Sequence, residues 1–366
     1  MRVLIIGGTA FIGPHVVRSL VAGGHEVTIF HRGEHEPELP RGVRHVHSVS
    51  AAFPVLSFPA ELVAWKPDVV LHMVAMGERD AEAVVRAFKG VARRLVVPSS
   101  GDVYGAYGVL IGSEAEAAQS GWLREDSPLR KNLYPYRKTA KGPDDWVYHY
   151  DKILVERVVM ADAELSGTIL RLPAVYGPGD SSHRFFPHLK RMDNRRPAIL
   201  LDEDQARWRW SHGYVENVAA AITLAVTDDR ASGRIYNVGE ESIPTTGERV
   251  RMLAELLGWA GKIVTLPRAS LPLHLRDAYH YSQDLAYDTS RIRSELGYRE
   301  IVSVDEGLLR TIAWLRAHPP GFDAAQYDYA AEQFAEKLPL SRPAPEGVVE
   351  KSSLTARLKA SPDTNR

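Results

Sequence analysis

The chain has 366 residues, of which 45% are hydrophobic and 25% charged, as in an ordinary globular protein with one large domain or two smaller ones. Its formal net charge of -1 lacks the basic surplus of a broad nucleic-acid surface, so we expect no nucleic-acid partner. The absence of cysteine excludes disulfides, thiolate metal sites and a cysteine nucleophile, and we expect no metal site.

The apolar runs of the sequence are short. The run over residues 69–76 is far below the roughly 20 residues that a membrane-spanning helix needs. The N-terminus reads as a buried strand and lacks the long apolar core and small-residue cleavage site of a signal peptide. We therefore expect a cytoplasmic protein without a membrane partner.

The first 100 residues alternate between strands and helices. Apolar runs predict strands at 2–6, 26–30, 43–47, 68–74 and 94–100. Apolar residues at helical spacing predict helices over 14–24 and 81–88, the first with Pro14 in its first turn and two glycines at its end. This alternation predicts an α/β fold, a doubly wound parallel sheet covered by helices on both faces.

The pattern changes after residue 105. Residues 106–147 are rich in Gly, Pro and Tyr and read as a long irregular insertion, either a surface loop or a lid over a substrate. A helix is predicted over 146–165 and a strand over 167–172, and the elements beyond residue 176 are shorter and mixed. A polar helix near 324–337 precedes a tail that we expect to be flexible.

The first strand runs directly into a glycine-rich turn. Gly7, Gly8 and Gly13 precede a predicted helix, and small residues there let a pyrophosphate approach the free N–H groups of a helix N-terminus. A tight strand–helix turn without a ligand is the alternative. The position of the turn at the start of a βαβ pattern favours a dinucleotide site.

Six segments occur in a fixed order along roughly residues 1–315, namely GGTAFIG, SSGDVYG, YHYDKILVE, RLPAVYGPGD, YVENVAAAI and YNVG. Together they resemble the extended short-chain dehydrogenase/reductase family, the NAD-dependent epimerases and dehydratases, and GGTAFIG with FHRG is most similar to an atypical branch of it. The resemblance implies a Rossmann domain at 1–175, with the insertion and a catalytic helix from about 147, and a smaller C-terminal α/β domain that binds substrate over most of 176–320. A C-terminal helix and tail follow at 321–366. The implied dinucleotide contacts are Gly7, Thr9, Phe11, Ile12, Gly13, Arg32, Val74, Ala75, Lys152, Leu172 and Pro173.

The spacing Tyr-x-x-x-Lys occurs twice, at Tyr134/Lys138 and at Tyr148/Lys152. A phenol can act as acid and base near an ammonium, which lowers its pKa, and residues four apart face the same way only in a helix. Prolines and glycines flank the first pair, whereas KILVERVVM continues a helix after the second. The resemblance implies that Tyr148 is the general acid/base and that Lys152 also holds the nicotinamide ribose. Glu156 lies one turn after Lys152, and the alternative to a catalytic role for Lys152 is an exposed salt bridge between the two.

The segment SSGDVYG adds two candidate catalytic residues. Ser100 stands where the resembled family has its catalytic Ser or Thr, although a serine after a strand is more often a cap. Asp102 stands where dehydratases and decarboxylases of that family carry an acid, so it either transfers a proton or caps the next turn. The expected substrate contacts are Tyr104, Arg184 and Arg209.

Several residues depart from the family pattern. His31 and Arg32 end the second strand where NAD-preferring members carry an acid, and a guanidinium can pair with a 2′-phosphate, so NADP is slightly favoured over NAD. Ala174 replaces an asparagine that contacts substrate in sugar-nucleotide epimerases. Trp210 takes the place of a phosphate-binding arginine, and both changes weaken the case for a UDP-sugar.

The sequence therefore predicts an NAD(P)-dependent oxidoreductase of the epimerase/dehydratase type, acting on a hydroxyl or ketone carbon of a sugar or sugar-like substrate. The alternative is a non-enzymatic dinucleotide sensor or an RNA-binding member of the atypical branch. The expected partner is a small-molecule substrate, with a homodimer as a further possibility.

Overall fold

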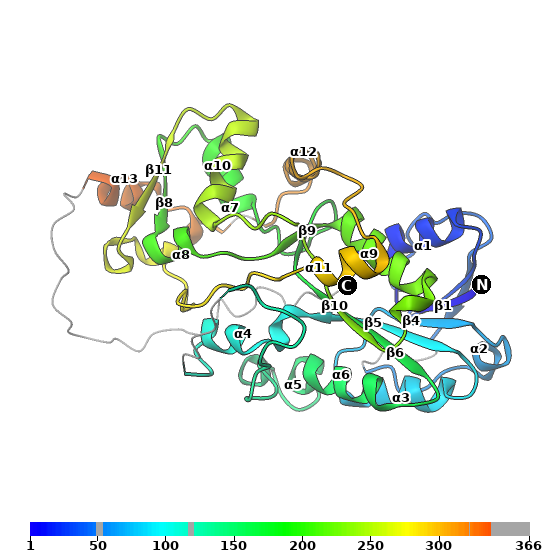
Figure 1. Cartoon of the computed structure of the whole chain (residues 1–366). Helices are drawn as coiled ribbons and strands as arrows, with labels where there is room; N and C mark the ends of the chain where they lie inside the picture. Colours follow the sequence, from blue (N-terminus) through cyan, green and yellow to red (C-terminus); the bar gives the residue numbers. More distant parts are fainter. Residues whose placement is uncertain (49–53, 116–120, 322, 338–366) are drawn as a thin grey trace.

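The computed structural model describes residues 1–48, 54–115, 121–321 and 323–337 (Figure 1). Its centre is a seven-stranded parallel sheet in the order β10-β6-β5-β4-β1-β2-β3. The order runs outward from β1 in both directions, which confirms the predicted doubly wound α/β sheet. The strands are β1 (Arg2–Ile6), β2 (Glu26–His31), β3 (Arg44–His47), β4 (Val69–His72), β5 (Arg94–Ser100), β6 (Ser166–Leu172) and β10 (Arg234–Asn237).

Helices cover both faces of this sheet. The helices α1 (Ile12–Ala22) and α9 (Val215–Thr227) pack together on one face, and α3 (Glu78–Phe88) packs with α6 (Lys152–Ala161) on the other (Figure 1). Burial on both faces explains why β1 and β4 are apolar along nearly their whole length. Both α9 and β10 follow residue 175, so the chain returns to the large sheet after entering a second lobe.

The second lobe is smaller and contains two short parallel strand pairs. They are β8 (Ala198–Asp202) with β11 (Lys262–Leu266), and β7 (Ala174–Tyr176) with β9 (His212–Tyr214). The predicted C-terminal helix is shorter than expected, with a 3-10 turn before α13; the predicted flexible tail, at 338–366, lies outside the described residues. Further helices are α2 (Ala60–Ala64), α7 (Phe186–Asp193), α8 (Glu203–Arg207), α10 (Thr246–Leu257), α11 (Ser290–Leu296), α12 (Val304–Ala317) and α13 (Tyr329–Lys337). Within the described ranges, no helix combines the length and hydropathy that crossing a membrane requires.

The prediction of one continuous helix over 146–165 is wrong. A short helix α5 (Trp146–His149) ends before Tyr150, and α6 begins only at Lys152. The break occurs because Asp151 has extended backbone angles and its carboxylate accepts a hydrogen bond from the Ile153 N–H at 2.9 Å, which makes it the N-cap of α6. Tyr148 and Lys152 therefore lie in different helices.

The insertion is more ordered than predicted where the structure describes it. It begins with a helix, α4 (Gly105–Leu110), and residues 116–120 lie outside the described ranges. Arg130 is fully buried and lies 3.5 Å from the buried Asp151 carboxylate, while the Tyr134 N–H donates to the other oxygen of that carboxylate at 2.6 Å. These contacts hold the insertion against the start of α6.

The alternative reading of Lys152 and Glu156 as an exposed salt bridge does not hold. Glu156 is 4% exposed, accepts a hydrogen bond from Ser99 Oγ at 2.6 Å and forms an ion pair with the buried Arg171 at 2.8 Å. The Lys152 ammonium donates instead to the Ala75 and Pro98 carbonyls. The Glu156 carboxylate thus joins α6 to β6.

His72 makes the stability of the fold depend on pH. Its ring is fully buried at the end of β4, neither ring nitrogen has a hydrogen-bond partner, and burial with the nearby Lys152 cation lowers its pKa from 6.5 to about 3. The neutral ring therefore stabilises the fold above the unfolded-state pKa, and this contribution is lost as the pH falls through that value toward 3.

When the pH falls from 7 to 5, the unfolding free energy of the wild type should drop because the unfolded chain takes up a proton at His72. In His72→Leu this drop should be smaller by about 2 kcal/mol. Urea unfolding at the two pH values measures this difference. Equal losses in the two proteins would contradict the assignment.

Candidate active site

Three cavities follow one another along the edge where β1, β4, β5 and β6 end. The glycine-turn cavity, about 430 Å³, is lined by Gly7, Thr9 and Arg32 among others. A middle cavity of about 30 Å³ lies beside Lys152, and an interlobe cavity of about 330 Å³ lies between the sheet and the second lobe. Ser100 lines both the middle and the interlobe cavity, so the two meet at the end of β5. Ligands of open α/β sheets bind at this edge.

The glycine-turn cavity has the shape that a pyrophosphate requires. Gly7 and Gly8 have φ of 86° and 85°, which favours glycine. A Cβ on Gly13 would lie 2.4 Å from the carbonyl carbon of Gly8, so only glycine permits this approach of α1 to the turn. No side chain caps the N-terminus of α1, where Phe11 and Ile12 line the adjoining middle cavity. The residues present therefore fit a dinucleotide.

Most of the predicted dinucleotide contacts lie along the first two cavities. Val74 lines the glycine-turn cavity, Phe11 and Ile12 line the middle one, and Leu172 and Pro173 continue into the interlobe one. Ala75 contributes its carbonyl, which accepts from Lys152 Nζ at 2.6 Å. Gly13 lies beneath the turn.

Asp102 is the centre of a buried polar cluster at the interlobe cavity. Its Oδ2 accepts hydrogen bonds from Tyr150 at 2.8 Å and Tyr136 at 3.1 Å. Its Oδ1 is buried without a partner, although Asp102 lines the cavity. Burial raises the pKa of Asp102, while Arg130 and the Tyr150 hydroxyl act in the opposite direction. Ser100 Oγ caps the intervening turn by accepting the Asp102 N–H at 3.2 Å.

Tyr148 lies apart from this cluster. Its ring packs under Arg137, whose guanidinium is 4.6 Å from the ring centroid, and it is not among the residues that line the three cavities. Tyr150 is only two residues before Lys152, and the Lys152 Nζ is 5.9 Å from the centre of its ring. The structure thus brings Ser100, Asp102 and Lys152 to adjoining cavities. The catalytic role of Tyr148 stays a prediction that rests on the family motif.

The predicted substrate contacts separate in the structure. Arg184 lines the interlobe cavity, with its guanidinium 5.3 Å from the centre of the Trp210 ring. Tyr104 is fully buried and donates a hydrogen bond to Asn237 at 2.5 Å, so it does not line this cavity. Arg209 does not line it either, and its guanidinium donates a hydrogen bond to the Ile243 carbonyl.

Sequence reasoning missed a charged residue of the interlobe cavity. Arg249 is buried on α10 beside Glu240, and its Nε and Nη1 have no hydrogen-bond partner although the residue lines the cavity. Trp210 also lines it, at a position that sequence reasoning marked only as a departure from the family pattern. Nothing in the local sequence around Arg249 distinguishes it from an exposed helix residue.

The sequence is similar to those of two curated enzymes. The chain is 28% identical to the 2'-dehydrokanamycin reductase of Streptomyces kanamyceticus over 295 residues, which is 79% of this chain and 76% of that one. It is 27% identical to the UDP-N-acetyl-alpha-D-glucosaminuronate decarboxylase of Bacillus cytotoxicus over 341 residues, which is 86% of this chain and 98% of the relative.

A solved structure supports the same grouping. MoeE5 in complex with UDP-glucose and NAD superposes with a TM-score of 0.59 at 25% identity, covering 87% of this chain and 99% of MoeE5. The sequence model of the NAD dependent epimerase/dehydratase family matches residues 3–239. The predicted class, an NAD-dependent oxidoreductase of epimerase/dehydratase type, is confirmed by these matches. The chain belongs to the NAD-dependent epimerase/dehydratase family.

Proposed function

We propose that this protein oxidises and reduces a hydroxyl-bearing carbon of a sugar or sugar-like substrate held in the interlobe cavity. The observation that carries the proposal is the junction at Ser100, which lines both the middle and the interlobe cavity. A substrate hydroxyl placed there lies within reach of the Asp102 carboxyl. A homodimer and a cytoplasmic location stay predictions.

The residues around the middle cavity suit the nicotinamide half of the dinucleotide. When bound, the nicotinamide accepts a hydride from the substrate carbon or returns it. Lys152 supplies an ammonium beside this position, and its two bonds to main-chain carbonyls fix the end of its side chain. Ser100 offers a hydroxyl that can orient the substrate oxygen.

Proton transfer is assigned to Asp102. Its free Oδ1 can accept the proton of the substrate hydroxyl, while Tyr150 and Tyr136 donate to Oδ2 and stabilise the carboxylate form. Burial pushes the pKa of this carboxyl upward, toward the range in which a general base is effective. Tyr148, which the family motif predicts as the acid/base, is the competing candidate.

Two arginines favour a substrate with an anionic group. Arg184 and Arg249 both line the interlobe cavity, and two nitrogens of Arg249 are unpartnered. A phosphate or carboxylate would satisfy these donors through charge-assisted hydrogen bonds. A nucleotide-activated sugar fits this requirement and agrees with the names of the decarboxylase relative and of the MoeE5 complex. The replacements at Ala174 and Trp210 mean that the contacts would differ from those of UDP-sugar epimerases.

The test is turnover of a substrate panel in deuterated water. The protein is incubated with NADP or NAD and with nucleotide-activated sugars, sugar phosphates and free sugars, and products are identified by mass and by dinucleotide absorbance. We expect an epimerised, dehydrated or oxidised product from an anionic member of the panel. Bound dinucleotide with no turnover of any member would favour the sensor alternative and contradict the proposal.

We further propose a modest preference for NADP over NAD. Arg32 lines the glycine-turn cavity with its side chain 25% exposed, and in the structure it pairs with Glu34 at 3.0 Å. A 2′-phosphate would compete with Glu34 for this guanidinium, while a bare ribose hydroxyl would gain little from it.

We expect NADP to bind about 10- to 100-fold more tightly than NAD, and Arg32→Ala to remove most of that difference. Binding isotherms of both dinucleotides on wild type and variant measure it. Tighter binding of NAD by the wild type, or an NADP affinity unchanged by the substitution, would contradict the preference.

A further inference from the structure

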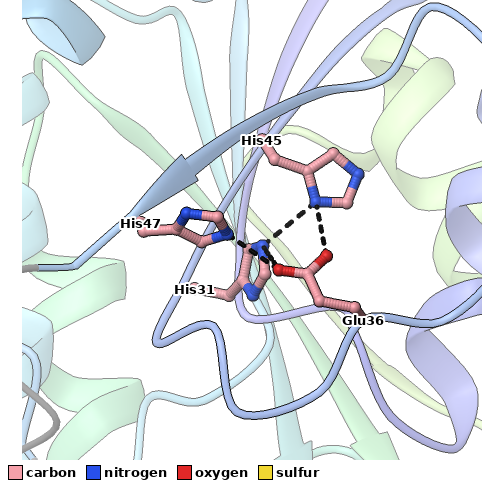
Figure 2. Close-up of side chains that lie close together, drawn as sticks. All are labelled: His31, Glu36, His45 and His47. Atoms are coloured by element: carbon pink, nitrogen blue, oxygen red, sulfur yellow. Dashed lines mark hydrogen bonds and ion pairs between the residues drawn. The ribbon is translucent and has the colours of Figure 1, made fainter.

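Three histidines and one glutamate converge at the edge of the large sheet. Strands β2 and β3 run parallel with His31 opposite His47, and His45 shares a face with His47 because it lies two residues earlier in the strand. Glu36 reaches the three rings from the loop after β2 (Figure 2). Each residue offers a ligand atom, and all four atoms lie within 4.8 Å of one another.

The spacing of these atoms matches a coordination shell. Glu36 Oε1 is 2.8 Å from His47 Nε2 and 3.8 Å from His31 Nε2, and Glu36 Oε2 is 3.2 Å from His45 Nδ1. His31 Nε2 is 3.1 Å from His45 Nδ1. Ligands about 2.0–2.1 Å from a tetrahedral zinc ion lie about 3.3 Å from one another. The observed separations fall on both sides of that value, so small side-chain adjustments would place an ion among the four atoms.

We propose that His31, His45, His47 and Glu36 form a binding site for a divalent transition metal, best suited to Zn²⁺. Imidazole nitrogens favour zinc and its neighbours, whereas Mg²⁺ and Ca²⁺ take oxygen ligands. Four protein ligands fill a tetrahedral shell, which is the pattern of a structural site. The prediction of no metal site was based on the absence of cysteine and did not take into account the His-x-His spacing of His45 and His47 on a strand.

The hydrogen bonds among the four ligand atoms give way to coordination when the ion binds, and one bond outside the cluster must open as well. The Gly33 N–H donates to His31 Nδ1 at 3.2 Å, which requires that nitrogen to be unprotonated. Coordination through Nε2 of a neutral ring places the proton on Nδ1 instead. The bond is long and Gly33 is an exposed loop residue, so turning its peptide removes the conflict.

A bound ion would join three segments at the edge of the large sheet. It would link the edge strand β3 and the loop carrying Glu36 to the end of β2, where His31 also lines the glycine-turn cavity. The ion would therefore stabilise the wall of that cavity. The evidence for the metal site does not rest on the reaction proposed above, and metal binding can be measured without turnover.

The test is metal binding by the full chain, purified without a polyhistidine tag and stripped with a chelator. We expect one equivalent of Zn²⁺ per chain by titration calorimetry, a rise in melting temperature on adding Zn²⁺, and the visible absorption of tetrahedral Co²⁺ on adding Co²⁺. Glu36→Gln and His47→Ala remove ligands whose side chains are 50% and 55% exposed, so both variants should fold. Each should weaken Zn²⁺ binding by at least the roughly 10- to 100-fold that loss of an outer-shell partner costs.

Two matched controls lie in the same loop. His35→Ala and Glu38→Gln remove an exposed histidine and an exposed carboxylate that are outside the cluster, and they should bind Zn²⁺ as the wild type does. Absence of a Zn²⁺ equivalent in the wild type would overturn the proposal. Equal affinities of the ligand variants and the controls would overturn it as well.

Discussion

Replacing Asp102 by asparagine should lower turnover by about 10²- to 10⁴-fold, the usual loss for a general acid–base group. The side chain keeps its shape, but the amide cannot accept a proton at the position of the buried, unpartnered carboxylate oxygen. Dinucleotide affinity should stay within about twofold of wild type, because Asp102 does not line the glycine-turn or the middle cavity. Steady-state kinetics on the substrate found in the panel, together with a dinucleotide binding isotherm, measure both quantities.

Phenylalanine substitutions at the neighbouring tyrosines separate two assignments of the proton-transfer group. Tyr150→Phe removes a hydrogen bond that lowers the pKa of Asp102, so the acidic limb of the pH–rate profile should move to higher pH. Tyr148→Phe, whose ring lies against Arg137, should leave that limb in place. Loss of turnover in Tyr148→Phe, with Asp102→Asn active, would show that the family motif assigns the acid/base correctly and that our geometric assignment is wrong.

Removing Arg171 should destabilise the fold by about 3–5 kcal/mol, because it leaves the Glu156 carboxylate buried without its cation. The Arg171 side chain is 2% exposed, pairs with Glu156 at 2.8 Å and donates to the Glu125 carbonyl at 2.9 Å. Its guanidinium also lies 4.8 Å from the centre of the Tyr104 ring. Arg171→Met, measured by urea unfolding near neutral pH, tests the size of the effect.

Two comparisons make this measurement specific to the buried pair. The double variant Arg171→Met with Glu156→Leu removes both charges and should be more stable than Arg171→Met alone. Arg207→Ala breaks an ion pair whose side chains are 69% and 66% exposed, and it should cost no more than about 1 kcal/mol. A loss in Arg171→Met no larger than that in Arg207→Ala would contradict the prediction.

The large sheet and the glycine turn could be predicted from the sequence because both depend on local patterns. Strands buried on both faces are continuous apolar runs, so β1, β2, β4 and β5 are visible in the sequence as such. The approach of Gly13 to Gly8 occurs within one strand–turn–helix unit. The same locality explains why most of the residues predicted to contact the dinucleotide line adjoining cavities, since they follow the ends of strands.

Only the tertiary structure decided which polar groups meet. The four-residue spacing predicted that Tyr148 and Lys152 share one helix. Asp151 separates them because it caps a new helix, and Arg130 and the backbone N–H of residue 134 hold its carboxylate in place. Spacing along the helix offered Glu156 only Lys152 as a partner, whereas its ion-pair partner Arg171 comes from the strand β6.

The interlobe cavity and the histidine cluster show the same limit at longer range. Asp102 meets Tyr136 and Tyr150, and Arg249 reaches the cavity from a helix nearly 150 residues further along the chain. His31 meets His47 only through the pairing of β2 with β3. Local sequence patterns report burial and spacing along one element, but they carry no information about contacts between side chains from distant elements, and those contacts form only when the sheet and the second lobe pack.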